Sequence, residues 1–214
     1  MGSNWAKTKT FFPLLLAELQ KRDCRNVCVV GAADGKFVLP LAGAGFEVMA
    51  LDIDETALYG GQLTFPGGRT QHSPGLVDYL NERGLANRVT VKHVNILDFE
   101  CDFAFDAIFT SCSWHYSTNH ETPVREYVRK MQALVRYEGV FCAEYMMPVE
   151  AKHFKTDHYM HEDQLRSYFN PTDWQLLEEF YTTPFVEAPH VGNLSEHVHR
   201  MGFLMAERLK TPSC

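Results

Sequence analysis

Residues Asn26 to Asp54, NVCVVGAADGKFVLPLAGAGFEVMALDID, decide the fold of this chain. The apolar run from Val27 to Val30 has the length and β-branched content of a buried parallel strand. A glycine-bearing turn, Gly31 to Gly35, follows, and apolar residues then recur at helical spacing. A second apolar run leads into Asp52. Strand, glycine turn, helix, strand and terminal acid are typical of a nucleotide-binding βαβ unit, because backbone can approach a ligand at the glycines and the acid can accept hydrogen bonds from ribose hydroxyls.

The rest of the chain alternates between strand-like and helix-like segments. Apolar periodicity and turn residues predict helices over residues 8–21, 55–58, 74–83, 123–135 and 162–169, strands over 89–94, 105–110, 140–145, 174–181 and 197–207, and loops over 64–73 and 146–160. Ser73-Pro74 and Thr122-Pro123 are expected to cap the helices that follow them.

This order predicts a doubly wound α/β fold, with about seven mostly parallel strands and a C-terminal antiparallel strand pair. Residues 1–214 are expected to form a single domain, in which the N-terminal helix within residues 1–22 covers the sheet or the site. Ligands bind beyond the carboxyl ends of the strands in such sheets. One rim should therefore gather four segments, Gly31–Gly35, Asp52, Asn95–Ile96 and Ser111–Tyr116.

Composition limits the partners and the compartment. The formal net charge of −7 argues against a nucleic-acid partner. No apolar run approaches the roughly 20 residues of a membrane span, and no signal peptide is evident. The six cysteines contain no CxxC pair, which favours a reduced, cytoplasmic location. The sequence leaves the oligomeric state open.

With these motifs in place, the chain resembles the class I S-adenosylmethionine-dependent methyltransferases along nearly all of its length. The resemblance is carried by VVGAADGKF, ALDID, VNILDF, FDAIFTS and VRYEGVF, followed by the C-terminal hairpin. The small size and the ending HRMGFLMAERLK are closest in layout to small-molecule methyltransferases of the tellurite-resistance type. Two positions depart from the family pattern: Val29 stands where an acid is common, and Ala33 replaces the middle glycine. An alanine at position 33 is tolerable if its φ is negative.

The resemblance implies an enzyme that moves a methyl group from S-adenosylmethionine to a nucleophilic N, O or S atom of a small molecule, leaving S-adenosylhomocysteine. It also implies the cofactor contacts. Gly31, Ala33 and Gly35 would pass beside the methionine moiety, with Asp34 near its ammonium group. Asp52 would hold the ribose hydroxyls, and Ile53, Asn95 and Ile96 would surround the adenine. Ser111 would lie near the amino-acid end of the cofactor.

The acceptor side is less specific in the sequence. His115 follows the fourth strand at the rim, where it could act as a base towards an amine, hydroxyl or thiol, or could only shape the site. Trp114 and Tyr116 flank it and could hold a cation or the sulfonium, although packing is the more ordinary use for either. Tyr145, Met147, His158 and Tyr159 are expected, from position alone, to line the acceptor pocket.

Two histidine groups raise the question of a metal. One is His153, His158 and His161; the other is His197 and His199, on one strand face. Their spacings match no strong zinc signature, so no metal site is predicted.

Three alternatives stay open on the sequence alone. Loops 64–73 and 146–160 could frame a groove for a peptide or protein acceptor. A nicotinamide-dependent oxidoreductase is less favoured, because GAADGK lacks the GxGxxG spacing. The departures at Val29 and Ala33 would also suit a protein that binds the cofactor without catalysis. Aromatic residues and His115 at the rim favour an amine or another nucleophile on a small metabolite, whose identity the sequence does not give.

Overall fold

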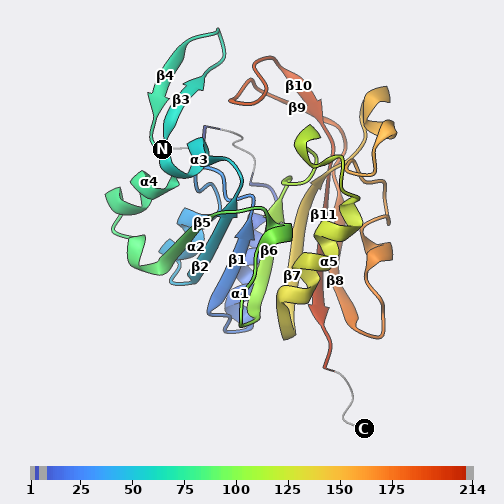
Figure 1. Ribbon diagram of the computed structural model, residues 1–214. Coiled ribbons are helices and arrows are strands. Elements are labelled where there is room, and N and C mark those ends of the chain that lie inside the picture. The colour runs from blue at the N-terminus through green and yellow to red at the C-terminus, as the bar shows by residue number, and fades with distance from the viewer. Residues whose placement is uncertain (1–2, 5–8, 211–214) are drawn as a thin grey trace. The chain divides into compact units, whose positions relative to one another are not determined.

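The computed structural model of the protein describes residues 3–4 and 9–210 (Figure 1). Its main sheet has seven strands in the order β5-β2-β1-β6-β7-β11-β8. The pairs β1·β2, β2·β5 and β6·β7 are parallel, whereas β11 is antiparallel to both β7 and β8. The predicted fold, a doubly wound sheet closed by an antiparallel pair, is confirmed.

The described residues divide into two compact units. Unit 1 holds residues 3–4, 9–95 and 186–198, and unit 2 holds residues 96–185 and 199–210. The single domain expected over residues 1–214 stays a prediction, and each unit is described by itself below.

The parallel strands of unit 1 are β1 (Asn26–Val30), β2 (Glu47–Asp52) and β5 (Val89–His93). Strand β1 is buried from Val27 to Val30, as its unbroken apolar run predicts. Its register pairs Val27 with Val48, and β2 in turn pairs Asp52 with His93. This register brings Asp52 to the carboxyl end of β2.

Four helices belong to unit 1: α1 (Phe12–Lys21), α2 (Val38–Gly43), α3 (Glu55–Tyr59) and α4 (Leu76–Glu82). Helix α1 buries its apolar face, and Phe12 packs on Phe37 with ring centroids 5.4 Å apart. The predicted helix 8–21 is confirmed from Phe12 onward, while Thr8 lies outside the described residues. Asp54 caps α3 by accepting from the Ala57 N–H at 3.1 Å.

The prediction of a loop over residues 64–73 is wrong. Strands β3 (Gly61–Thr64) and β4 (Thr70–Ser73) form a hairpin there, drawn above α3 in Figure 1. The Gly67-Gly68 pair takes positive φ values of 87° and 78° and closes the turn, which polar composition alone does not reveal. The expected cap is also displaced, because Ser73 ends β4 and Gly75 is the N-cap of α4.

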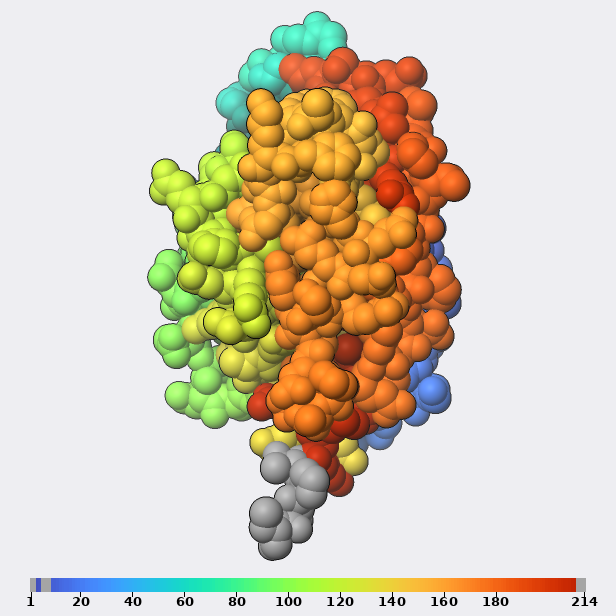
Figure 2. All heavy atoms as spheres, turned by 90° about the vertical axis from the view of Figure 1, so that its right-hand side faces the viewer, coloured from blue at the N-terminus to red at the C-terminus, as the bar shows by residue number. Residues whose placement is uncertain are grey.

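Unit 2 contains strands β6 (Phe105–Ser111), β7 (Val135–Met146), β8 (Trp174–Tyr181) and β11 (Met201–Arg208). Helix α5 (Val124–Leu134) contacts β6 and β7 through its apolar face. Strand β8 is the edge of the sheet, and Figure 2 shows this side, where the segment leading into β8 (orange) covers much of the surface. The other described elements are short. Five are 3₁₀ helices: η1 (Ala86–Arg88), η2 (Ile96–Asp98), η3 (Ser117–Asn119), η4 (Ala151–Lys155) and η5 (Arg166–Tyr168). Two are strands: β9 (Phe185–Glu187) and β10 (His197–His199).

Unit 2 corrects four predicted boundaries. Strand β7 begins five residues before the predicted Val140, because the chain leaves α5 directly into an extended conformation at Val135. The helix predicted over residues 162–169 is reduced to η5, and the loop 146–160 contains η4. The strand predicted over residues 197–207 is interrupted at Arg200.

The start of α5 also differs from prediction. Its N-cap is Pro123, which offers no side-chain cap, and the Val124 N–H instead donates to the Asp157 carboxylate at 3.4 Å.

Among the described residues the longest helix is α5, with 11 residues. No described helix is long and apolar enough to span a bilayer.

Candidate functional site

The glycine turn of unit 1 is tied to the end of β2 by backbone hydrogen bonds. The N–H groups of Gly31 and Ala32 both donate to the Leu51 carbonyl, at 2.9 and 3.0 Å, and the Gly35 N–H donates to the Ala32 carbonyl at 3.0 Å. Gly35 has φ +92°, and a Cβ there would lie 2.7 Å from Leu76 Cδ1. The turn therefore needs this glycine for its own conformation and packing, apart from any ligand.

Asp52 stands at the centre of the predicted cofactor residues in unit 1. Its Oδ2 accepts from the Ala33 N–H at 2.7 Å, and its Oδ1 accepts from the Asp54 N–H at 2.9 Å. Each oxygen keeps a lone pair for a further donor, such as a ribose hydroxyl. Burial raises the pKa of Asp52, and the backbone hydrogen bonds from Asp54 and Ala33 oppose that rise.

Two neighbouring positions fit the same ligand. Ile53 is 48% exposed directly after Asp52, although it is a large apolar residue, and could pack on a flat ring. The Val94 N–H donates to the Asp52 carbonyl at 2.9 Å, which holds the following residue, Asn95, at this end of the strands. The adenine contacts expected of Ile53 and Asn95 stay predictions.

Ala33 does not meet the condition under which an alanine would be tolerated here without cost. Its φ is +46°, in the left-handed region, and not negative. A non-glycine residue in this conformation carries backbone strain of about 1 kcal/mol. The hydrogen bond from the Ala33 N–H to the Asp52 carboxylate helps to stabilise the strained conformation.

We expect Ala33→Gly to raise the free energy of unfolding by about 0.5–1 kcal/mol, because glycine adopts this φ without a Cβ clash. Urea denaturation of the two proteins measures the change. Ala32→Gly, at the preceding residue, whose φ is not positive, is the matched control and should destabilise. Equal effects of the two substitutions would contradict the assigned strain.

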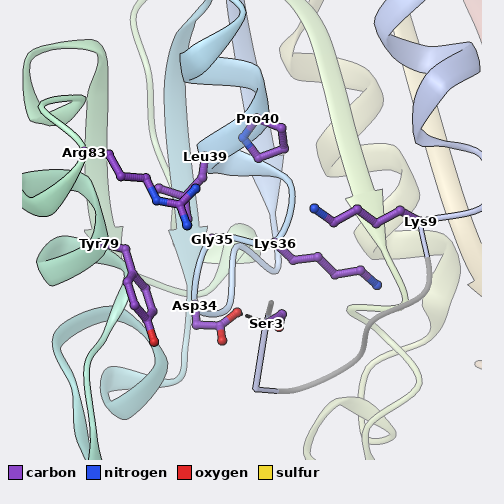
Figure 3. Close-up of a pocket in the computed structure, with 9 residues that line it drawn as sticks. All are labelled: Ser3, Lys9, Asp34, Gly35, Lys36, Leu39, Pro40, Tyr79 and Arg83. Atoms are coloured by element: carbon purple, nitrogen blue, oxygen red, sulfur yellow. Dashed lines mark hydrogen bonds between the residues drawn. The ribbon is translucent and has the colours of Figure 1, made fainter. Parts of the chain in front are cut away.

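Both carboxylate oxygens of Asp34 already accept hydrogen bonds within the chain. Its Oδ1 accepts from Ser3 Oγ and its Oδ2 from the Asn4 N–H, both at 2.6 Å, while Asn4 Nδ2 donates to Ser73 Oγ at 2.7 Å. Figure 3 shows Asp34 meeting Ser3 at a pocket that is also lined by Tyr79 and by three basic side chains, Lys9, Lys36 and Arg83. The predicted contact of Asp34 with the methionine ammonium stays a prediction, and it requires Ser3 and Asn4 to share or release the carboxylate.

In unit 2, the segment after β6 forms a rigid turn. Cys112 has φ +52°, and its N–H donates to the Glu144 carbonyl at 2.8 Å. His115 Nδ1 bonds the Cys112 carbonyl at 2.7 Å, and the His115 carbonyl faces His120 Nε2 at 2.9 Å. The turn thus fixes both the backbone and the ring of His115.

The state of the His115 ring follows from these contacts. A carbonyl only accepts, so Nδ1 carries the proton and Nε2 carries the lone pair. Burial lowers the pKa of His115 to about 4; the hydrogen bond to Cys112 opposes this, and nearby His199, His120 and His153 add to it. His115 is therefore neutral at pH 7. Its Nε2 is unprotonated and can accept a hydrogen bond, but it is a weak base.

Aromatic side chains surround His115. Its ring centroid lies 4.3 Å from that of Tyr116 and 5.7 Å from that of Tyr159, which in turn stacks on His153 at 4.0 Å with an interplanar angle of 4°. Tyr116 is 49% exposed, so this group reaches the surface of unit 2. Apolar faces beside a bare nitrogen suit an organic molecule that carries an N–H or O–H group.

The other predicted acceptor residues lie deeper. Trp114, Tyr145, Met147 and His158 are all buried. The Tyr145 ring covers Gly202, where a Cβ would come within 2.3 Å of it, and burial raises the pKa of this phenol. His158 contacts Thr156 and Asp157 and lies 4.7 Å from the His120 ring. Their roles at an acceptor stay predictions.

Sequence reasoning missed Glu144. This carboxylate is 1% exposed within β7, and Ser111 Oγ donates to its Oε2 at 2.6 Å. Ser111, expected near the amino-acid end of the cofactor, is therefore oriented by a buried carboxyl group. A single glutamate within the apolar run VFCAEYM is the signal that could have revealed it. Ile96, the last of the predicted cofactor residues, is buried at the start of η2.

Comparison with solved structures places this geometry in a known fold. TehB from Haemophilus influenzae matches with a TM-score of 0.64 and 15% identity, over 95% of this chain and 64% of that chain. Magnesium protoporphyrin IX methyltransferase (ChlM) from Synechocystis PCC 6803 with bound SAM matches with a TM-score of 0.58 and 14% identity, over 92% of this chain and 78% of that one. The [4+2]-cyclase SpnF matches with a TM-score of 0.62 and 11% identity, over 99% and 89% of the two chains.

These likenesses concern architecture. The chain spans less than two thirds of the length of TehB, and SpnF is described as a cyclase, so the shared fold does not by itself assign a reaction. Neither a protein-family model nor a curated protein sequence matches this chain. The seven-stranded sheet and its solved neighbours together show that the chain has the class I S-adenosylmethionine-dependent methyltransferase fold.

Proposed function

We propose that this protein transfers a methyl group from S-adenosylmethionine to a nucleophilic atom of a small molecule. The observation that carries the proposal is the Asp52 carboxylate, held at the end of β2 by the Ala33 and Asp54 N–H groups. Its two oxygens are spaced to accept from the two vicinal hydroxyls of a ribose. Support also comes from ChlM, which has the same fold, is a methyltransferase by name and was crystallised with SAM.

The proposed contacts divide between the two units. In unit 1, Gly31, Ala33 and Gly35 line the methionine moiety, Asp52 holds the ribose, and Ile53 and Asn95 meet the adenine. In unit 2, Ile96 adds to the adenine contacts and Ser111, set by Glu144, serves the amino-acid end.

On the acceptor side, His115 Nε2 accepts a hydrogen bond from the acceptor's N–H or O–H and orients its lone pair. With a pKa near 4, this imidazole is better suited to orientation than to storing a proton. Orientation suffices for much of the rate, because in-line attack on a sulfonium methyl gains chiefly from alignment. Tyr116 and Tyr159 supply apolar faces for an organic acceptor, and an amine is the favoured nucleophile.

We expect Asp52→Asn to weaken binding of S-adenosylhomocysteine and S-adenosylmethionine about 10- to 30-fold, because charge-assisted hydrogen bonds to the ribose are lost. Titration calorimetry measures both ligands. Asp54→Asn is the matched control, since asparagine caps a helix as well as aspartate, and its affinity should stay within about twofold of the original. No binding by the unchanged protein, or equal losses in both variants, would remove the cofactor assignment.

Transfer itself needs a separate measurement. Methyl-labelled cofactor incubated with a panel of amines, phenols and thiols should yield a labelled product with one acceptor class. Binding without transfer to any member would favour a different reaction, and SpnF, a [4+2]-cyclase by name, has a similar fold.

A cytoplasmic setting is part of the proposal. No disulfide joins the five cysteines in the described part of the chain, which is compatible with a reducing compartment.

A further inference from the structure

A histidine–glutamate cluster lies in the 186–198 segment of unit 1, and none of its three members belongs to the site described above. Glu187 ends β9, His190 follows in the connecting turn, and His197 begins β10. The Glu187 Oε2 atom is 3.8 Å from the Nε2 atoms of both His190 and His197, and the three ligand atoms lie within 4.8 Å of one another. The side chains are only 12–17% exposed, so the cluster is largely shielded from water.

The hydrogen bonds of the two rings determine which nitrogen faces the carboxylate. His190 Nδ1 bonds the Val191 carbonyl at 2.6 Å, and His197 Nδ1 bonds the Ser195 carbonyl at 2.8 Å. Because a carbonyl only accepts, each Nδ1 carries a proton, and in the neutral ring each Nε2 then offers its lone pair. A backbone acceptor on the far nitrogen is the usual support of a metal-binding histidine.

The Glu187 carboxylate faces both imidazole rings at short range. Its Oε2 atom is 3.8 Å from each Nε2 atom, which is too long for a hydrogen bond but close enough for an ion to bridge. The His190 Nε2 atom is buried and has no hydrogen-bond partner among the described residues. A shielded imidazole nitrogen beside a carboxylate oxygen can therefore hold a positive ion.

The spacing suits a transition metal. Zinc bonds of 2.0–2.1 Å to nitrogen or oxygen place neighbouring tetrahedral ligands roughly 3.3 Å apart. The two 3.8 Å separations therefore need to shorten by about 0.5 Å for an ion to be held, and the separation of the two nitrogens, which is at most 4.8 Å, by up to about 1.5 Å. Imidazole with one carboxylate is a donor set typical of Zn²⁺, and Ca²⁺ and Mg²⁺ prefer oxygen ligands alone.

The backbone brings the ligands together before any ion arrives. His190 and Asn193 exchange both backbone hydrogen bonds, at 2.9 and 3.1 Å, around Gly192 with φ +89°. This turn folds the segment back, so that the His190 and His197 ring centroids lie 5.0 Å apart. A preformed site loses less entropy on binding, which favours a tight complex.

We propose that Glu187, His190 and His197 bind one divalent transition-metal ion of the Zn²⁺ type. The prediction of no metal site weighed His197 with His199 and, separately, His153, His158 and His161; neither Glu187 nor His190 entered it.

The ion would also steady the cofactor turn. The Val191 N–H donates to the Asn4 carbonyl at 3.0 Å, and the Asn4 N–H donates to Asp34 at 2.6 Å. The segment beside His190 is therefore joined to the glycine turn through one residue. Fixing the 186–198 segment with a metal restricts Asn4 and, through it, the Asp34 carboxylate.

Zinc titration of the untagged, chelator-treated full chain tests the proposal. We expect one Zn²⁺ per chain with a Kd below about 1 μM, and Co²⁺ should give visible absorption bands of a tetrahedral nitrogen–oxygen site. His190→Ala and Glu187→Gln should each weaken Zn²⁺ binding at least 100-fold. His72→Ala, an exposed histidine of β4, is the control and should leave stoichiometry and affinity unchanged.

Thermal denaturation with and without Zn²⁺ guards against variants that fail to fold. Zinc should raise the Tm of the unchanged protein and of His72→Ala, and should leave the Tm of a folded Glu187→Gln variant unchanged. A Kd weaker than about 100 μM for the unchanged protein, or equal binding by Glu187→Gln and His72→Ala, would overturn the site. None of these measurements depends on cofactor binding. Their outcome therefore tests the metal site independently of the proposed methyltransferase function.

Discussion

Gly75→Ala should lower the free energy of unfolding by about 3 kcal/mol. A Cβ at this position would lie 2.2 Å from the Gly60 nitrogen and 2.6 Å from the Leu58 carbonyl oxygen. Both are backbone atoms, so no side-chain rotation relieves the clash, and the junction between α3 and α4 must move apart. Urea denaturation followed by far-UV circular dichroism measures the loss.

Gly43→Ala is the matched control for this substitution. Gly43 is the last residue of α2, and a Cβ there meets nothing within 4 Å. Alanine is the better helix former, so this change should stabilise by up to about 1 kcal/mol. If Gly75→Ala were as well tolerated as Gly43→Ala, the close packing of the 58–60 and 75 backbones would be disproved.

The largest pH effect is expected from His115. Its folded-state pKa, about 4, lies below its ordinary value of 6.5, so the unfolded chain binds more protons between these pH values. This group's contribution is therefore complete above pH 6.5, falls as the pH drops towards 4, and changes no further below that. The shift corresponds to roughly 3 kcal/mol, which partial exposure of the ring reduces to about 2 kcal/mol.

The variant His115→Asn isolates this contribution, because the asparagine amide can still donate to the Cys112 carbonyl but does not titrate. Its free energy of unfolding should fall less steeply between pH 6.5 and 4 than that of the unchanged protein, by about 2 kcal/mol over the range. His72→Asn, with an exposed side chain, should retain the original slope. A parallel pH profile in His115→Asn would show that the buried, neutral imidazole is wrongly assigned.

Local sequence patterns predicted the elements that have one clear period. The apolar run of β1, the glycine turn, α2 and the acid at the end of β2 were all recognisable, because burial on both faces and backbone conformation leave direct traces in residue type. Residues 174–181 were found as β8 although this edge strand is buried only at Trp174. The predictions for polar segments were less accurate. Residues 64–73 were predicted as a loop but form an exposed hairpin around a Gly-Gly turn. Residues 162–169 were predicted as a helix but contain only one 3₁₀ turn.

The candidate site shows the same division. Asp52 was recognisable from its distance to the glycine turn, and the hydrogen bonds to Ala33 and Asp54 support its predicted place. The positive φ of Ala33 was not predictable, because alanine alone does not signal a left-handed conformation. Glu144 was missed because its partner, Ser111, is 33 residues away in the chain.

By itself, the sequence determined the order of strands and helices, the acid at the end of β2 and the resemblance to a methyl-transferring family. Periodicity, strand burial and turn chemistry are local properties, so residue type expresses them directly. Only the tertiary structure decided the neutral state of His115, the engagement of Asp34 by Ser3 and Asn4, and the convergence of Glu187, His190 and His197. Each depends on distances across the folded chain, and a one-residue change in a turn or register would remove it.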